Sequence, residues 1–280
     1  MSQSNDSTRA DAASAPLAPT AGHSEADTAA STLIPPTGHP SGGAAPAMPG
    51  RLAQLLVVIL GVLPLYLLPW LLRRAHGGAV HLTGMLLYPL LIGGAAIVWL
   101  LFLQRRVCRD DLAGLGWRAG GPWSNLGEGL LLTAAYLVIA AATQATVARW
   151  APGRGPSPEI VELILRLSEN PWLMLVWLGP VAWIGAALFE ELARVFVLRR
   201  LWLAWPGTTA RNVAVIASAL AFGLVHYYQG PPGMVSTGFM GLVAGAVFLF
   251  RGRLWPLVVG HAVYDMISIG MGVLQVRGMV

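Results

Sequence analysis

The second half of the chain places six ionisable side chains inside long apolar stretches. These residues are Glu190, Glu191, Arg194, His226, His261 and Asp265. Residues three or four apart are neighbours on a helix, so the arginine can pair with either glutamate, and the second histidine lies one turn before the aspartate. An ionisable group in the hydrocarbon core of a membrane costs about 2.5 kcal/mol or more, which makes these six residues the candidate functional site.

A cluster of carboxylates and imidazoles can activate water in two ways. Glu190, His226 and His261 would be a usual donor set for zinc, with one position left open for water. Equally, a glutamate could act without metal as a general base on water, while the histidines orient that water or stabilise an oxyanion. Both chemistries point to hydrolysis. Zinc is therefore a candidate cofactor, and a metal-free mechanism stays open.

The two glutamates would divide their roles through Arg194, which would keep one ionised and leave the other free to take a proton. Around a regular helix, the angular offset from Arg194 is about 40° for Glu190 and about 60° for Glu191. The sequence therefore does not decide which glutamate is the base. Asp265 would either fix the tautomer of His261 or act directly.

The composition is that of a membrane protein. Of 280 residues, 55% are hydrophobic and 11% are charged, whereas soluble domains average roughly a quarter charged residues. The net charge of +5 comes from 18 arginines, without a single lysine, that lie singly or in pairs at the ends of apolar runs. This pattern sets membrane topology and excludes nucleic-acid binding.

Charges and turn residues divide the chain into seven runs long enough to cross a bilayer, or eight if a long run is broken, since about 20 apolar residues suffice. Pro180 predicts a kink inside the fourth run, and 158–170 predicts a helix lying in the interface. The expected fold is an all-α, polytopic transmembrane helix bundle. The runs are 52–72, 82–104, 129–148, 171–203, two within 212–250 that are split at 227–233, and 254–276.

Two regions differ in composition. Residues 1–50 are rich in Ala, Ser, Thr and Pro without apolar periodicity and predict a disordered tail, whereas 51–280 form the transmembrane domain. The loops after the second, fourth and sixth runs carry nine arginines and the other loops carry five. The arginine-rich loops are therefore expected in the cytoplasm.

Three motifs, EELAR (190–194), FGLVH (222–226) and HAVYD (261–265), follow one another on three expected spans. In type and order they resemble the signature of the CPBP family of intramembrane proteases, which includes the CAAX prenyl endopeptidases. The resemblance covers roughly 171–275, the expected catalytic core. It implies a helical core that cleaves a peptide or a membrane-anchored protein with an activated water, at a site open toward the cytosol. The usual arginine lies four residues after the second glutamate, but here it lies three after it.

Other readings stay open at this stage. A proton-coupled transporter would also place Glu, His and Asp at mid-membrane. A catalytically inactive scaffold of the same fold would keep the helices, with the Glu–Arg motif as a structural ion pair. The abundance of Ala, Gly and Arg suits a GC-rich bacterial genome, so the expected location is the bacterial inner membrane. The sequence gives no indication of the oligomeric state.

Overall fold

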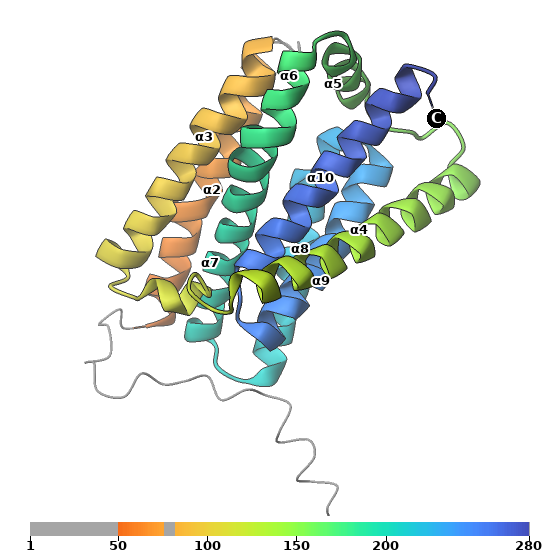
Figure 1. Cartoon of the computed structure of the whole chain (residues 1–280). Coiled ribbons are helices and arrows are strands. Elements are labelled where there is room, and N and C mark those ends of the chain that lie inside the picture. Colours follow the sequence, from red (N-terminus) through yellow and green to blue (C-terminus); the bar gives the residue numbers. More distant parts are fainter. Residues whose placement is uncertain (1–49, 76–81, 280) are drawn as a thin grey trace, which may run out of the picture. The chain divides into compact units, whose positions relative to one another are not determined.

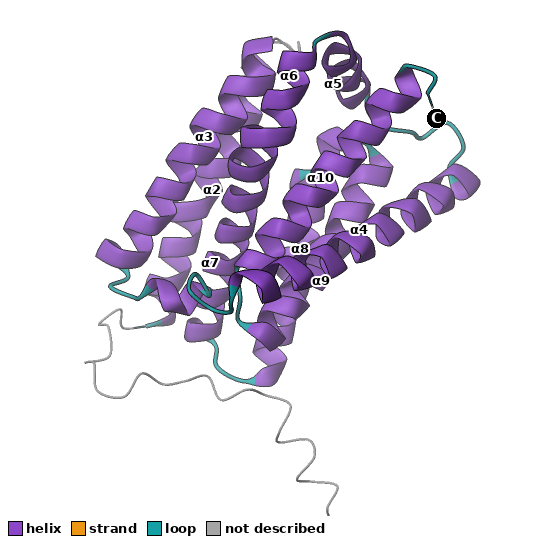
Figure 2. Cartoon of the chain, in the orientation of Figure 1, coloured by secondary structure: helices purple, strands orange, loops and turns teal. Residues whose placement is uncertain are grey.

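The protein was analysed as a computed structural model that describes residues 50–75 and 82–279. The part of the chain that it describes contains helices and no strands (Figure 2), which confirms the all-α prediction. The predicted tail lies outside this part, apart from Gly50. The long helices are α2 (Arg51–Ala75), α3 (Leu82–Phe102), α4 (Pro122–Trp150), α7 (Phe189–Ala204), α8 (Thr208–Val225), α9 (Pro231–Arg251) and α10 (Trp255–Val276).

Seven helical stretches are long and apolar enough to cross a membrane, as predicted. The fourth is the longest, at 34 residues, and comprises α6 (Pro171–Val176), a π-helical segment (Trp177–Leu188) and α7. The long charge-free run between 212 and 250 is divided into α8 and α9 by a short 3-10 turn, Tyr227–Gln229. The segment between the third and fourth spans forms α5 (Pro158–Glu169), so the predicted helix is present there.

The predicted kink at Pro180 is confirmed. Gly179, the residue before it, has non-helical angles (φ −89°, ψ −107°), and the turns from Trp177 to Leu188 are π-helical. Proline lacks an N–H and clashes with the preceding turn, so the regular hydrogen-bond ladder cannot continue through it. The glutamates follow where α-helical geometry resumes, at Phe189.

Small residues allow the helices around the site to approach closely, which is a common means of helix packing in membranes. On α8, a Cβ added to Gly223 would lie 2.8 Å from the carbonyl oxygen of Met234 on α9. Between α4 and α10, a Cβ on Gly260 would lie 2.7 Å from Cβ of Leu132. The hydroxyl of Thr133 donates to the carbonyl oxygen of Gly260 (3.2 Å) and fixes this second contact.

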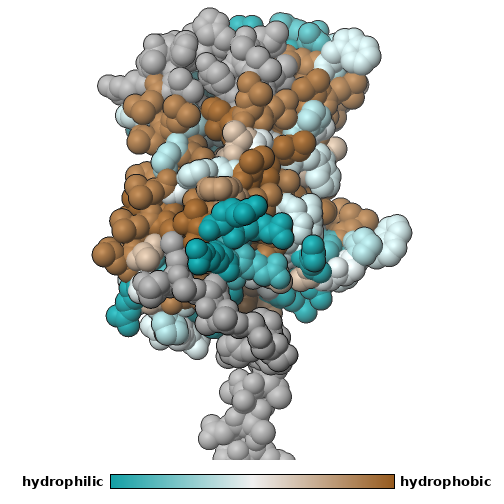
Figure 3. Space-filling view, turned by 90° about the vertical axis from the view of Figure 1, so that its left-hand side faces the viewer, coloured by the Kyte–Doolittle hydropathy of each residue, from teal (hydrophilic) through white to brown (hydrophobic). Residues whose placement is uncertain are grey.

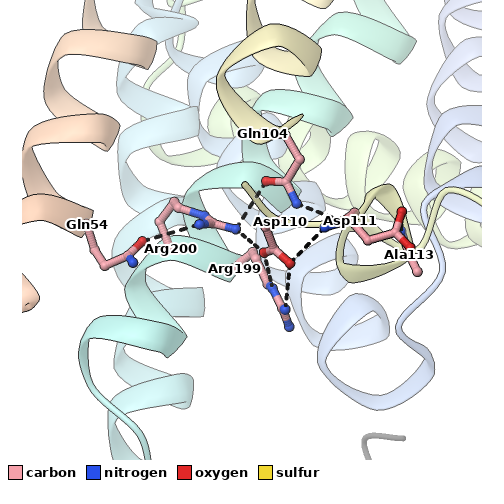
Figure 4. A network of polar contacts seen from close by, with 7 residues as sticks. All are labelled: Gln54, Gln104, Asp110, Asp111, Ala113, Arg199 and Arg200. Atoms are coloured by element: carbon pink, nitrogen blue, oxygen red, sulfur yellow. Dashed lines mark hydrogen bonds and ion pairs between the residues drawn. The ribbon is translucent and has the colours of Figure 1, made fainter. Parts of the chain in front are cut away.

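A polar network holds the lower end of the bundle together (Figure 4). Arg200 on α7 is 1% exposed. It donates to Oε1 of Gln104 (3.1 Å), to Oε1 of Gln54 on α2 (3.4 Å), and to the carboxylate of Asp110. Arg199 donates to the same carboxylate through Nε (3.2 Å). We call Gln54, Gln104, Asp110, Arg199 and Arg200 the polar latch, because they tie α2, the end of α3 and α7 to one another.

The loops with the larger share of arginines lie at this same end. The backbone N–H of Leu254 donates to the carbonyl oxygen of Gly116 (3.3 Å), so the α9–α10 turn contacts the α3–α4 loop. The side chain of Arg253 donates to Glu128 at the start of α4 (3.1 Å). Figure 1 shows the α3–α4 loop and the end of α7 near one another at the bottom of the view. The spans therefore alternate in direction as the arginine count requires.

The polar latch yields a prediction for stability. Burial raises the pKa of the Asp110 carboxyl, but the hydrogen bonds and positive charges of Arg199 and Arg200 outweigh burial and hold the pKa below its ordinary value. We expect Asp110→Asn to lower the free energy of unfolding by about 3 kcal/mol, because it leaves Arg200 charged, buried and unpaired. Chemical unfolding in detergent measures this difference.

The neighbouring Asp111→Asn is the matched control. Its side chain accepts from the backbone N–H of Ala113 at a helix start, and asparagine caps helices equally well. We expect almost no change in this variant. Since the folded pKa of Asp110 lies below the unfolded value of about 3.9, the wild type gains this stability above about pH 4 and loses it as pH falls further. Equal losses of unfolding free energy in Asp110→Asn and Asp111→Asn would contradict the stabilising role of the polar latch.

Candidate active site

The six predicted residues come together in the membrane-spanning bundle, supplied by α7, α8 and α10. Glu191, which is 1% exposed, lies at the centre of the cluster. Its Oε2 lies 3.2 Å from Nε of Arg194, and its Oε1 lies 2.9 Å from Nδ1 of His261. A buried charge is stable only when a partner compensates it, and Glu191 has two such partners.

Arg194 is buried between helices rather than extended toward water. Its guanidinium lies 4.0 Å from the centre of the Phe222 ring, in the geometry of a cation–π contact. On α9, a Cβ added to Gly241 would lie 3.0 Å from Nη1 of Arg194. The absence of a side chain at Gly241 therefore makes room for the arginine, and Phe222 packs against its guanidinium.

His226 follows the last residue of α8 and is 5% exposed. Its Nδ1 lies 2.7 Å from the carbonyl oxygen of Phe222. A carbonyl oxygen only accepts, so Nδ1 carries a proton and donates it. In the neutral ring Nε2 is then an acceptor, and it faces Oε2 of Glu190 at 3.5 Å. The ring of Tyr228 stacks on His226 at 5.8 Å between centroids.

Glu190 lies between the two histidines. Its Oε2 is 3.5 Å from Nε2 of His226 and 3.8 Å from Nε2 of His261. This oxygen is buried and accepts no hydrogen bond from any residue that the structure describes. Oδ2 of Asp265 lies 3.6 Å from the same Nε2 of His261. Two ring nitrogens and two carboxylates thus border one small polar region.

The structure decides which glutamate contacts Arg194. The helical angles slightly favour Glu190, but Arg194 contacts Glu191, because the long arginine side chain is oriented by its neighbours rather than by the angle at its Cα. Glu191 also takes the position that the sequence suggested for Asp265, since it accepts the hydrogen bond from Nδ1 of His261. Asp265 approaches Nε2 of that ring instead.

Two tyrosines from the first spans lie near the cluster and were not found from the sequence. Tyr66 on α2 contacts the ring of Phe189 (5.6 Å between centroids) and interacts electrostatically with Glu190. Tyr136 on α4 is 2% exposed and interacts electrostatically with Glu191. A single tyrosine in an apolar run is typical of interfacial belts, so neither carried a usable signal.

The metal hypothesis requires donors placed around one point at about 2.0 to 2.2 Å. Among the residues that the structure describes, no group of three or more His, Cys, Asp or Glu side chains could hold a metal ion. Glu190, His226 and His261 therefore do not fit a metal ion as they lie. Zinc stays a prediction, and no step below depends on it.

Comparison with known families gives one match. A family model described as type II CAAX prenyl endopeptidase, Rce1-like, matches residues 171–267. This match confirms the resemblance stated above, includes all six site residues, and is to a family of proteases; α2 to α5 lie outside it. No curated protein and no solved structure matches the chain. With seven candidate spans, the chain is an integral, multi-pass membrane protein.

The contact between Glu191 and Arg194 predicts coupled effects on stability. Glu191→Gln should lower the free energy of unfolding by about 3 kcal/mol, because it leaves a buried guanidinium unpaired. Combining it with Arg194→Met should restore much of that loss, since the uncompensated charge is then removed. Unfolding in detergent, followed by tryptophan fluorescence, measures all four proteins of the cycle.

The matched control is the exposed pair Glu162 and Arg166 on α5, at 2.6 Å. Exposed pairs contribute at most about 1 kcal/mol, so the same double-mutant cycle there should give a coupling free energy close to zero. A double variant of Glu191 and Arg194 that is as unstable as the sum of the single variants would contradict this account.

Proposed function

Because residues 171–267 match a family of CAAX prenyl endopeptidases, we propose that this protein is an intramembrane endopeptidase that hydrolyses a peptide bond with a water activated by Glu190. The observation that carries the proposal is the buried Oε2 of Glu190, which faces Nε2 of both His226 and His261 without a hydrogen bond of its own. A water bound there would donate one proton to Glu190 and the other to Nε2 of His226.

The first step forms the bond between water and the scissile carbonyl. Glu190 takes a proton from the water as the water oxygen attacks the carbonyl carbon, and the carbonyl oxygen becomes an oxyanion. Nδ1 of His261 donates to Glu191, and a ring that also carries a proton on Nε2 would donate that proton to the oxyanion. Glu191 holds this ring in position through Nδ1.

The second step breaks the peptide bond. The proton on Glu190 passes to the leaving nitrogen as the oxyanion re-forms the carbonyl and the carbon–nitrogen bond breaks. The products are an amine and a carboxylic acid, which then releases its remaining proton to water and becomes a carboxylate. Glu190 is thereby returned to its starting state. This cycle assigns the base to Glu190 and leaves to Glu191 the part of a positioning residue, since both of its oxygens already face Arg194 and His261.

The substrate that we propose is a peptide segment of a membrane-associated protein in the inner membrane of a bacterium. Since the composition suits a bacterial genome, a prenylated substrate is not required, and the cleaved chain would be held to the membrane by another lipid or a span.

We expect Glu190→Gln to lower the rate of cleavage by about 10²- to 10⁴-fold, because glutamine cannot take the proton from water. Sequencing new amino termini in membranes that contain wild type or variant would identify the substrates, and a fluorescent prenylated tetrapeptide tests the CAAX specificity directly. Glu162→Gln is the matched control, since Glu162 is an exposed carboxylate on α5 and its loss should leave cleavage unchanged. Full activity in a folded Glu190→Gln protein would rule out this base.

The metal question has a separate test. We expect purified protein to hold no stoichiometric zinc by elemental analysis, and cleavage to survive a chelator, because the donors do not fit a metal ion as they lie. About one equivalent of zinc that disappears in both His226→Ala and His261→Ala would contradict the metal-free mechanism while leaving the endopeptidase proposal in place.

A further inference from the structure

A second charged feature lies outside the active site, where α3 ends. The helix closes with a π-helical turn, Leu103–Val107, and a short loop follows it. Arg105, Arg106 and Arg109 are exposed there and form no ion pair with any residue that the structure describes. We call these three residues the arginine patch. Figure 3 shows hydrophilic side chains in the lower half of one face of the bundle, next to hydrophobic ones.

The acids next to this patch do not neutralise it. Asp110 is turned inward, where Arg199 and Arg200 share its carboxylate (Figure 4). Asp111 is exposed and accepts from the backbone N–H of Ala113. One exposed negative charge thus stands against three exposed positive charges, so the patch has an excess of positive charge.

An irregular backbone turns the acidic Asp110 inward and leaves the arginines beside it at the surface. Arg109 has φ +50° and is the only residue other than glycine with a positive φ in the described part of the chain. Such a conformation costs free energy and persists where the surrounding structure enforces it, often at functional positions. π-helical turns are likewise enriched at functional sites. Here the π-helical turn and the positive φ of Arg109 come directly before Asp110. The side chain of Asp110 is part of the polar latch, while the three arginines stay at the surface.

Exposed apolar side chains adjoin the patch along α3. Val98 is 69% exposed, and Phe102 is 48% exposed and stacks on Trp99. Val107 lies between the arginines and is 38% exposed. A ligand that complements both the arginine patch and the apolar side chains of α3 has a phosphate group attached to apolar chains. A guanidinium binds phosphate through two parallel hydrogen bonds, and hydrocarbon chains cover apolar side chains.

We propose that the arginine patch binds the headgroup phosphate of an anionic membrane lipid, whose acyl chains lie along Val98 and Phe102. A lipid fits better than free phosphate, because the candidate span Pro89–Val107 ends within the patch, which places these arginines at the level of the lipid headgroups and Val98 and Phe102 beside the acyl chains. This site is independent of the proposed peptidase activity.

The test is lipid binding to purified full-length protein, measured by native mass spectrometry with phosphatidylglycerol and phosphatidylcholine of identical acyl chains. Wild type should retain phosphatidylglycerol preferentially. Arg105→Gln combined with Arg106→Gln should weaken that binding at least tenfold, since each arginine near an anionic surface contributes roughly fivefold. The matched control is Arg149→Gln with Arg154→Gln, which removes two exposed arginines of the α4–α5 region and should leave the preference unchanged.

A lysine variant and competition with inorganic phosphate distinguish lipid binding from misfolding and from binding of a soluble anion. If the glutamine variant does not fold, Arg105→Lys with Arg106→Lys keeps the charge but loses the planar donors, and it should bind phosphatidylglycerol more weakly than wild type. The proposal is overturned if phosphatidylcholine binds equally well, if the control pair loses as much binding, or if the lysine variant binds as wild type does. Displacement of the lipid by inorganic phosphate alone would assign the patch to a soluble anion and would also overturn it.

Discussion

The carboxylate of Glu191 constrains most of what surrounds it. A negative charge this deeply buried is stable only beside positive charge and hydrogen-bond donors. Arg194 supplies the positive charge and His261 supplies the hydrogen-bond donor. The guanidinium of Arg194 fits beside α9 because Gly241 has no side chain. The flat face of the guanidinium packs against the aromatic ring of Phe222. Three helices are thereby fixed around one charge, and Glu190 is left as the carboxylate with an oxygen to spare.

The helix that carries both glutamates is held at two places. Near its start, Glu191 is bound to α10 through His261. Near its end, Arg200 is bound to α2 and to the end of α3 through the polar latch. Between these points α7 is regular, so the distance from one anchor to the other is set. The first spans, which lie outside the family match, therefore contribute to the site by fixing α7 rather than by supplying its ionisable residues.

Much of the fold could be predicted from the sequence, because burying a charge in a membrane is costly and charged residues therefore mark the ends of the spans. Charge-free runs gave the spans, and the position of Pro180 gave the kink. The candidate site was predicted from residues such as His226, whose side chain is costly to place in an apolar helix.

The contacts within the site could not be predicted in the same way. Which oxygen meets Arg194, and whether Glu191 or Asp265 orients His261, depends on three helices meeting in space, and helical spacing describes only one helix at a time. Tyr66 and Tyr136 were missed because their approach to the glutamates exists only once α2 and α4 are packed against α7 and α10.

The hydrogen bond between Glu191 and His261 joins residues 70 positions apart, and this has a consequence for how the protein is made. Chains grow at about 5 to 20 residues per second, so the ribosome adds His261 about 4 to 14 s after Glu191. During that interval α7 and α8 are synthesised without the helix that completes the cluster. The contacts of Glu191 with His261 therefore form only after the last span has been synthesised.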